Sequence, residues 1–165
     1  MARPFLLIDV DGVLNPLAQA PGHVPAGYVP HDVDGLRVLL STDHGIWLSD
    51  LASSYDLVWA TSWEHDADRL IAEAVGLPRG LPVISFAAQD GWTNKLPDII
   101  RYVGDRPLAW IDDQPGAEVR DWADARNAAG IPTLLVETDY RVGLTLFDVG
   151  RLREFALRLA GPISD

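Results

Sequence analysis

Residues 5–13, FLLIDVDGV, combine an apolar run with two carboxylates at its end. The four apolar residues at 5–8 are typical of a strand that is buried on both faces. Burial of the acids that follow, Asp9 and Asp11, costs free energy unless something pairs them. Either the strand ends in a polar turn at Asp11 and Gly12, a common loop pair, or the two acids are held together for a chemical purpose.

Apolar runs and helical patterns alternate along the rest of the chain. Near-continuously apolar strands joined by helices predict an α/β fold with three Rossmann-like layers: a central, mostly parallel sheet with helices on both faces. The Pro- and Gly-rich residues at about 15–40 predict a loop or hairpin insertion. The predicted strands are 5–9, 56–61, 106–112 and 131–137, with a short edge strand at 81–86; the predicted helices are 45–54, 64–76, 95–104, 115–130 and 148–160.

Composition narrows the classes of function. A chain of 165 residues that is 48% apolar and 22% charged predicts one globular domain over residues 1–165. The formal net charge of −11 argues against a broad, non-specific nucleic-acid footprint, although a single phosphate end is still compatible with it. The chain has no cysteine, no signal-peptide pattern and no apolar run of about 20 residues, so we expect a cytoplasmic location and no membrane partner.

Ligands of parallel α/β sheets bind at the carboxyl ends of the strands, where several polar residues fall in this chain. Acids that converge at such an edge repel one another unless a cation lies among them, and carboxylate oxygens suit a hard metal such as Mg²⁺. Lys95, at the start of the helix before the third strand, is placed to supply further positive charge. The residues at or beside the strand ends are Asp9, Asp11, Thr61, Ser62, Asp112 and Asp113.

Each of these residues also has a purely structural interpretation. Thr61 suits the N-cap of the following helix, with Glu64 completing a capping box. Asp113 suits the N-cap of the helix that begins near Pro115. Lys95 suits a solvated surface position, although a cation in the first turn of a helix opposes the helix dipole. The order of these residues and their common position at strand ends favour a shared site.

Four motifs in this order resemble the haloacid dehalogenase (HAD) superfamily of aspartyl phosphatases. They are DVDGV at 9–13, the strand-ending threonine of VWATSW, the lysine of TNKLPD and the acidic pair of LAWIDD at 108–113. More narrowly, WATSWEHDAD, LAWIDD and YRVGLT resemble a capless HAD branch associated with bacterial RNA-repair proteins. The resemblance implies a HAD-like fold, and the short segments between the predicted strands leave no room for a large cap domain.

The resemblance also implies a reaction, a phosphatase activity through an aspartyl-phosphate intermediate. Asp9 would attack phosphorus, and Asp11 would act as the general acid and base. Mg²⁺ would lie between the Asp9 carboxylate, the Asp11 backbone carbonyl and the acidic pair Asp112–Asp113, and which acid of that pair contacts the metal stays open. The remaining roles would be phosphate binding by Thr61 and Ser62 and charge neutralisation by Lys95.

An open site suits a large or terminal phosphate, so the expected substrate is a nucleic-acid end or a phosphoprotein. The alternative is a domain that keeps the fold but only binds, or that accepts a phosphoryl group for signalling. Among the tryptophans, Trp59 and Trp110 are expected in the core, whereas Trp63 and Trp92 flank the predicted active edge and either pack or stack on a base.

Overall fold

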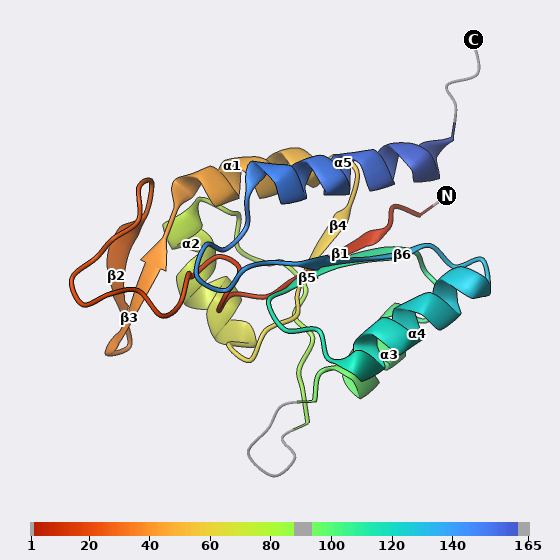
Figure 1. Ribbon diagram of the computed structural model, residues 1–165, viewed down its shortest axis with the longest axis horizontal. Coiled ribbons are helices and arrows are strands. Elements are labelled where there is room, and N and C mark those ends of the chain that lie inside the picture. The colour runs from red at the N-terminus through yellow and green to blue at the C-terminus, as the bar shows by residue number, and fades with distance from the viewer. Residues whose placement is uncertain (1, 88–93, 162–165) are drawn as a thin grey trace.

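The computed structural model describes residues 2–87 and 94–161. Its central sheet has four parallel strands in the order β4-β1-β5-β6 (Figure 1). Each strand is short and mostly buried, as the apolar runs of the sequence predict. Their bounds are β1 (Phe5–Ile8), β4 (Asp56–Trp59), β5 (Leu108–Asp112) and β6 (Thr133–Glu137).

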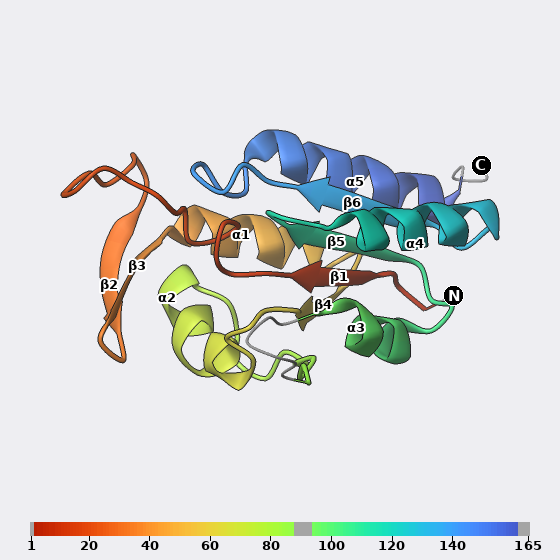
Figure 2. The same cartoon turned by 60° about the horizontal axis from the view of Figure 1, so that its bottom comes forward.

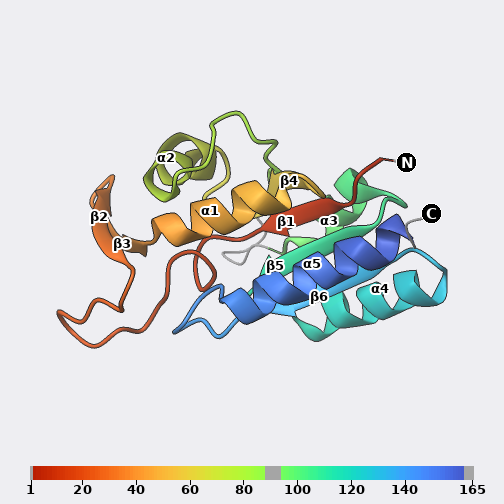
Figure 3. The ribbon, with the colours of Figure 1, turned by 90° about the horizontal axis from the view of Figure 1, so that it is seen from above.

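Helices cover both faces of this sheet, so the predicted three layers are present (Figures 1 and 3). Successive residues of β1 alternate between the two faces: Leu6 and Ile8 belong to one core cluster and Leu7 to the other. Complete burial of one such side chain contributes about 1.5–3 kcal/mol. One face holds α1 (Thr42–Leu51) and α5 (Leu146–Ala160), and the other holds α3 (Leu96–Val103) and α4 (Ala117–Ala128). The helical segments η1 (Ala67–Ile71) and α2 (Ala72–Val75) lie beside α1 and share its core cluster.

The insertion after β1 contains an antiparallel hairpin, β2 (Val29–Val33) and β3 (Leu36–Leu40). Its two-residue turn is Asp34–Gly35, and both residues have positive φ, which is typical of a tight hairpin turn. The hairpin lies beyond the carboxyl ends of the sheet strands (Figure 2). The described residues contain no larger cap over the sheet.

The predicted edge strand at 81–86 is wrong, because this segment forms only one bridge, between Trp59 and Val83. Pro82 has no N–H to donate to a ladder, and the N–H of Leu81 bonds to the side chain of Asp68 at 3.0 Å. The predicted helix at 45–54 starts earlier, at Thr42, because the Ser41 hydroxyl accepts the N–H of Asp43.

No helix within the described ranges combines the length and the apolar character that crossing a membrane requires.

Candidate functional site

Three acids meet at the carboxyl ends of β1 and β5. Asp9 directly follows β1, Asp112 ends β5 and Asp113 comes next; one carboxylate oxygen from each lies within 4.8 Å of the others. The two strands are held in register at this end, since the N–H of Asp9 donates to the carbonyl of Ile111 at 3.2 Å. Asp9 and Asp112 are each only 6% exposed. The structure therefore brings together acids that are more than 100 positions apart in the sequence.

Lys95 bridges two of these acids. Its Nζ lies 2.8 Å from Asp9 Oδ2 and 2.6 Å from Asp112 Oδ2, and its side chain is 16% exposed. Lys95 immediately precedes α3, the helix on one face of the sheet, and its side chain reaches the strand ends from there. It is the one lysine in the chain. The interpretation of Lys95 as a solvated surface residue is therefore wrong.

The cluster carries more negative than positive charge, with three carboxylates against one ammonium. Burial raises the pKa of Asp9 to about 7, and the charge of Asp112 adds to this rise while Lys95 opposes it. Burial, and then the charge of Asp112, also raise the pKa of Asp113. Burial disfavours the charge of Lys95, but the attraction of Asp9 and Asp112 outweighs this and raises its pKa. A set of oxygen donors with uncompensated negative charge fits a hard divalent cation.

The two adjacent acids differ in their surroundings. Asp112 accepts from Lys95 at one oxygen and from the backbone N–H of Gln114 at the other, at 2.9 Å. Asp113 lies against Gly12, and among the described side chains none donates to its carboxylate. The expectation that Asp113 caps the next helix is wrong, since α4 has Gly116 as its N-cap and no side-chain cap. Asp113 therefore has the freer carboxylate.

The side chain of Asp11 is bonded by two residues outside the acid cluster. Its Oδ1 accepts from Asn15 Nδ2 at 2.8 Å, and its Oδ2 accepts from Trp63 Nε1 at 2.9 Å. Asp11 is half-buried, whereas Asn15 is buried and Trp63 packs against the core. The side chains of Asp9 and Asp11 thus occupy separate environments although they are two residues apart.

Thr61 and Ser62 follow β4, whose end lies beside that of β1: the N–H of Ala60 donates to Ile8 at 2.9 Å. Thr61 is fully buried and Ser62 is exposed. The Thr61 hydroxyl accepts the N–H of Trp63 at 3.3 Å. The predicted capping box is wrong, because turn residues separate Thr61 from the helical segment, which starts at His65, and the Glu64 carboxylate accepts from the N–H of Phe86 instead.

The YRVGLT segment serves the site indirectly. Gly143 has φ +78°, and a Cβ there would lie 2.6 Å from the carbonyl of Val13. The next residue, Leu144, donates its N–H to the same carbonyl at 2.8 Å. Thr145 forms a capping box with Asp148 at the start of α5. These contacts hold the loop that follows Asp9 and Asp11 against α5, so the segment has a structural role.

Sequence reasoning missed two residues that support the site, Asn15 and Thr138. Thr138 follows β6 and donates its hydroxyl to the carbonyl of Gly12 at 2.7 Å. Both lie in segments without a recognisable pattern, so only the tertiary contacts identify them. Trp59 and Trp110 are in the core as predicted, at 0% and 2% exposure, whereas Trp92 lies outside the described residues.

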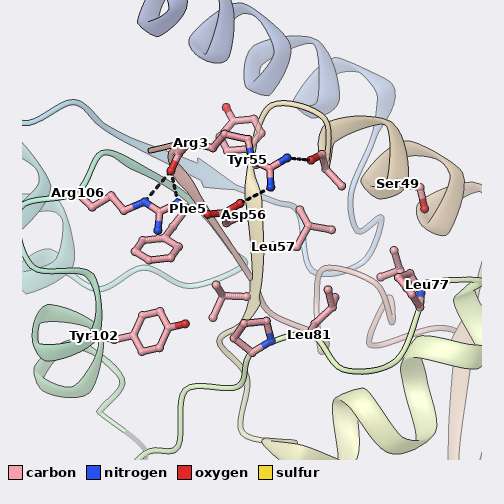
Figure 4. A pocket seen from close by; sticks show the side chains of 14 residues that line it. Arg3, Phe5, Ser49, Tyr55, Asp56, Leu57, Leu77, Leu81, Tyr102 and Arg106 are labelled. Carbon is pink, nitrogen blue, oxygen red and sulfur yellow. Dashed lines mark hydrogen bonds and ion pairs between the residues drawn. The ribbon is translucent and has the colours of Figure 1, made fainter. Parts of the chain in front are cut away.

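The cavities beside the acids are open. One of about 390 Å³ is lined by Lys95, Asp112 and the start of α4, and another of about 590 Å³ is lined by Asp113 and residues 137–141. A cavity of about 670 Å³ lies elsewhere, at the amino end of β4 (Figure 4). Its Arg3 and Arg106 both pair with Asp56, and its remaining walls are mostly apolar. The candidate site therefore does not coincide with this larger cavity.

Comparison with known proteins adds no relative, since no protein-family model and no curated protein matches the chain.

Proposed function

We propose that the protein is a Mg²⁺-dependent phosphohydrolase of the HAD type that works through an aspartyl-phosphate on Asp9. The observation that carries the proposal is the bridge from Lys95 to Asp9 and Asp112 at the carboxyl ends of two adjacent strands. A buried carboxylate that is paired with a cation, and that lies beside further acids in an open site, suits a nucleophile for an anionic phosphate. The order of these residues along the chain agrees with the HAD resemblance.

In the first step, an Asp9 oxygen bonds to phosphorus while the bond from phosphorus to the leaving oxygen breaks. The leaving oxygen takes the electron pair of that bond and a proton from Asp11. In the second step, water attacks phosphorus and gives a proton to Asp11, and the bond to Asp9 breaks to release phosphate. Lys95 offsets negative charge on Asp9 and on the transferring group throughout.

Asp9, Asp113 and the backbone carbonyl of Asp11 would hold the Mg²⁺ ion, with Asp112 mainly orienting Lys95. When bound, the ion would supply charge neutralisation between the anionic nucleophile and the anionic phosphate. This division follows from the contacts of the acidic pair, since both Asp112 oxygens already accept hydrogen bonds and Asp113 is freer.

Ser62 and the turn that follows β4 would bind phosphoryl oxygens, with Thr61 shaping the turn from its buried position. The open cavities beside the acids suit a phosphate at the end of a large molecule, so we propose a nucleic-acid end or a phosphoprotein as the substrate class. The net charge of −11 favours recognition of the terminal phosphate over contacts along a nucleic-acid backbone.

The test is hydrolysis of p-nitrophenyl phosphate with and without Mg²⁺ by the wild type and by Asp9→Asn. We expect metal-dependent turnover in the wild type and a loss of at least about 100-fold in the variant, since losing nucleophilic catalysis costs several factors of ten. Asp121→Asn, which changes an exposed acid on α4, is the matched control and should keep full activity. Turnover by Asp9→Asn at the wild-type rate would contradict the proposal.

Two further outcomes separate the alternatives. Stable phosphorylation of Asp9 by a small phosphodonor without turnover would indicate a phosphoaccepting domain, and the absence of both would indicate a binding domain. If turnover is found, a panel of 5′- and 3′-phosphorylated DNA and RNA ends, phosphopeptides and small sugar phosphates tests the substrate class. A higher kcat/KM on the small phosphates than on the macromolecular ends would contradict that part of the proposal.

A further inference from the structure

We propose that Trp63 and Asn15 are positioning residues that aim the Asp11 carboxylate at the leaving oxygen of the substrate. This inference rests on the proposed function, because it concerns how the acid and base of that reaction is held. It assigns roles to two neutral side chains that are not members of the acid cluster of Asp9, Asp112 and Asp113.

The two side chains donate hydrogen bonds to different oxygens of the same carboxylate. Trp63 Nε1 lies 2.9 Å from Asp11 Oδ2, and Asn15 Nδ2 lies 2.8 Å from Asp11 Oδ1. Two donors on different oxygens fix the plane of the carboxylate and remove its rotation about the terminal bond. Each oxygen has two lone-pair positions, so one on each stays free for proton transfer. The two hydrogen bonds therefore orient the Asp11 carboxylate and still leave it able to transfer a proton.

The orientation of Asn15 is set by the hairpin. Its Oδ1 accepts the backbone N–H of Leu39, in β3, at 2.9 Å. A backbone N–H can only donate, so the amide oxygen must face Leu39 and the NH₂ group must face Asp11. Asn15 is 6% exposed, and its own N–H bonds to Val10 at 2.9 Å. The hairpin thus fixes one side of the Asp11 carboxylate.

The other side is fixed by the turn after β4. Trp63 donates its backbone N–H to the Thr61 hydroxyl, and its ring packs against the core. An indole N–H can only donate a hydrogen bond, so Trp63 Nε1 is always the donor and Asp11 Oδ2 the acceptor. Because Thr61 and Ser62 belong to the same turn, the groups that we assign to phosphate binding and to the orientation of Asp11 move together.

The consequence is a specific kinetic signature. Protonation by a general acid matters for a basic leaving oxygen and matters little for one that leaves readily as an anion. The parameter kcat/KM covers the steps up to departure of the leaving group, so it isolates the acid role of Asp11. A misaimed Asp11 therefore lowers kcat/KM for phenyl phosphate and leaves that for 2,4-dinitrophenyl phosphate almost unchanged. A general structural defect lowers both.

The experiment compares these two esters in the wild type, Trp63→Phe, Asp11→Asn and the double variant. We expect Trp63→Phe, which keeps an aromatic ring but lacks the N–H, to lower kcat/KM for phenyl phosphate by about 10-fold, below the full effect of a general acid. For the dinitrophenyl ester we expect a change within about twofold. In the Asp11→Asn background, Trp63→Phe should cause no further loss. Trp122→Phe, on α4, is the matched control and should behave as wild type.

Asn15→Ala removes the other hydrogen bond to the Asp11 carboxylate, and the same two esters are compared in it. If Trp63→Phe does not fold, Asn15→Ala takes its place. An equal loss on both esters, or no loss on phenyl phosphate, overturns the positioning role while the phosphatase proposal stands. Additive losses in the double variant overturn it as well. If the wild type hydrolyses neither ester, the phosphatase proposal fails, and the positioning role fails with it.

Discussion

Gly12 and Asp113 lie so close together that a Cβ on Gly12 would be 2.4 Å from the Cγ of Asp113. Gly12 also has φ +75°, a conformation that side chains disfavour. The absence of a side chain at position 12 therefore makes room for the acid to which we assign metal binding. In the structure the Asp113 side chain fills the space beside Gly12.

We expect Gly12→Ala to displace Asp113 and to weaken Mg²⁺ binding by at least about 10-fold, because the new methyl group occupies the position of the carboxylate. The backbone strain alone should cost about 1–2 kcal/mol of stability. Gly22→Ala is a matched control, since Gly22 has φ +76° and open space around it. Isothermal titration with Mg²⁺ and urea unfolding measure the two effects. Equal Mg²⁺ affinity in the two variants would show that the contact with Asp113 is unimportant.

The division of roles between the two adjacent acids predicts different responses to Mg²⁺. A ligand that binds only the folded state at 100 times its Kd stabilises that state by about 2.7 kcal/mol. We expect Asp113→Asn to lose most of this stabilisation while folding normally without metal. Asp112→Asn should in addition weaken the metal-free protein, since it removes a partner of Lys95. Thermal melts with and without Mg²⁺ test this, and a full Mg²⁺ effect in Asp113→Asn would refute the assignment.

Lys95→Met should leave the carboxylates of Asp9 and Asp112 facing each other without a cation. Removal of one partner of a buried ion pair typically costs about 3–5 kcal/mol. The penalty should be larger at pH 8 than at pH 5, because the pKa of Asp9 is raised to about 7 by burial even with Lys95 present, and a protonated acid needs no partner. Urea unfolding at both pH values checks this. Arg158→Met, which removes an exposed pairing with Glu154, is the control and should change stability little.

Burial of His44 should lower the free energy of unfolding of the protein at acidic pH. Its ring is 1% exposed, and its Nδ1 has no hydrogen-bond partner among the described residues. Burial lowers its pKa from 6.5, against the opposing effects of the Leu144 carbonyl and Asp43. The unfolded chain therefore binds a proton first, and the contribution of His44 to stability is present above about pH 6.5 and is lost as the pH falls toward the folded pKa.

This contribution is measured as the difference between the wild type and His44→Gln in urea unfolding without metal, from pH 7.5 to 5.5. Asp9 is present in both proteins, so its contribution to the pH dependence of stability drops out of this difference. That contribution has the opposite sign, because the raised pKa of Asp9 favours the folded state at lower pH. We expect the advantage of the wild type to shrink as the pH falls. A constant difference over this range would contradict the prediction.

Much of the fold was predictable because the signals are local and periodic. The run before Asp9 and the run before Asp112 are fully apolar, and a strand buried on both faces requires that. The hairpin was predicted only as one of two alternatives for residues 15–40, and its strands were not placed, because the segment is rich in Pro and Gly and β2 and β3 form a small separate sheet. The segment at 81–86 was misassigned because its apolar character serves packing, with Ile84 and Phe86 in the core.

Strand and helix periodicity act locally, so the amino-acid sequence was enough to predict that acids end two buried strands and that a single lysine precedes a helix. The pairing of the side chains, by contrast, depends on the folded arrangement of the elements. Lys95 bonds to Asp112 and not to Asp113, and Trp63 reaches Asp11 across 52 positions of sequence. Such pairings depend on the direction in which each side chain leaves its own element and on which elements the fold makes neighbours. The spacing of residues along one segment determines neither the direction of a side chain nor the neighbours of its element.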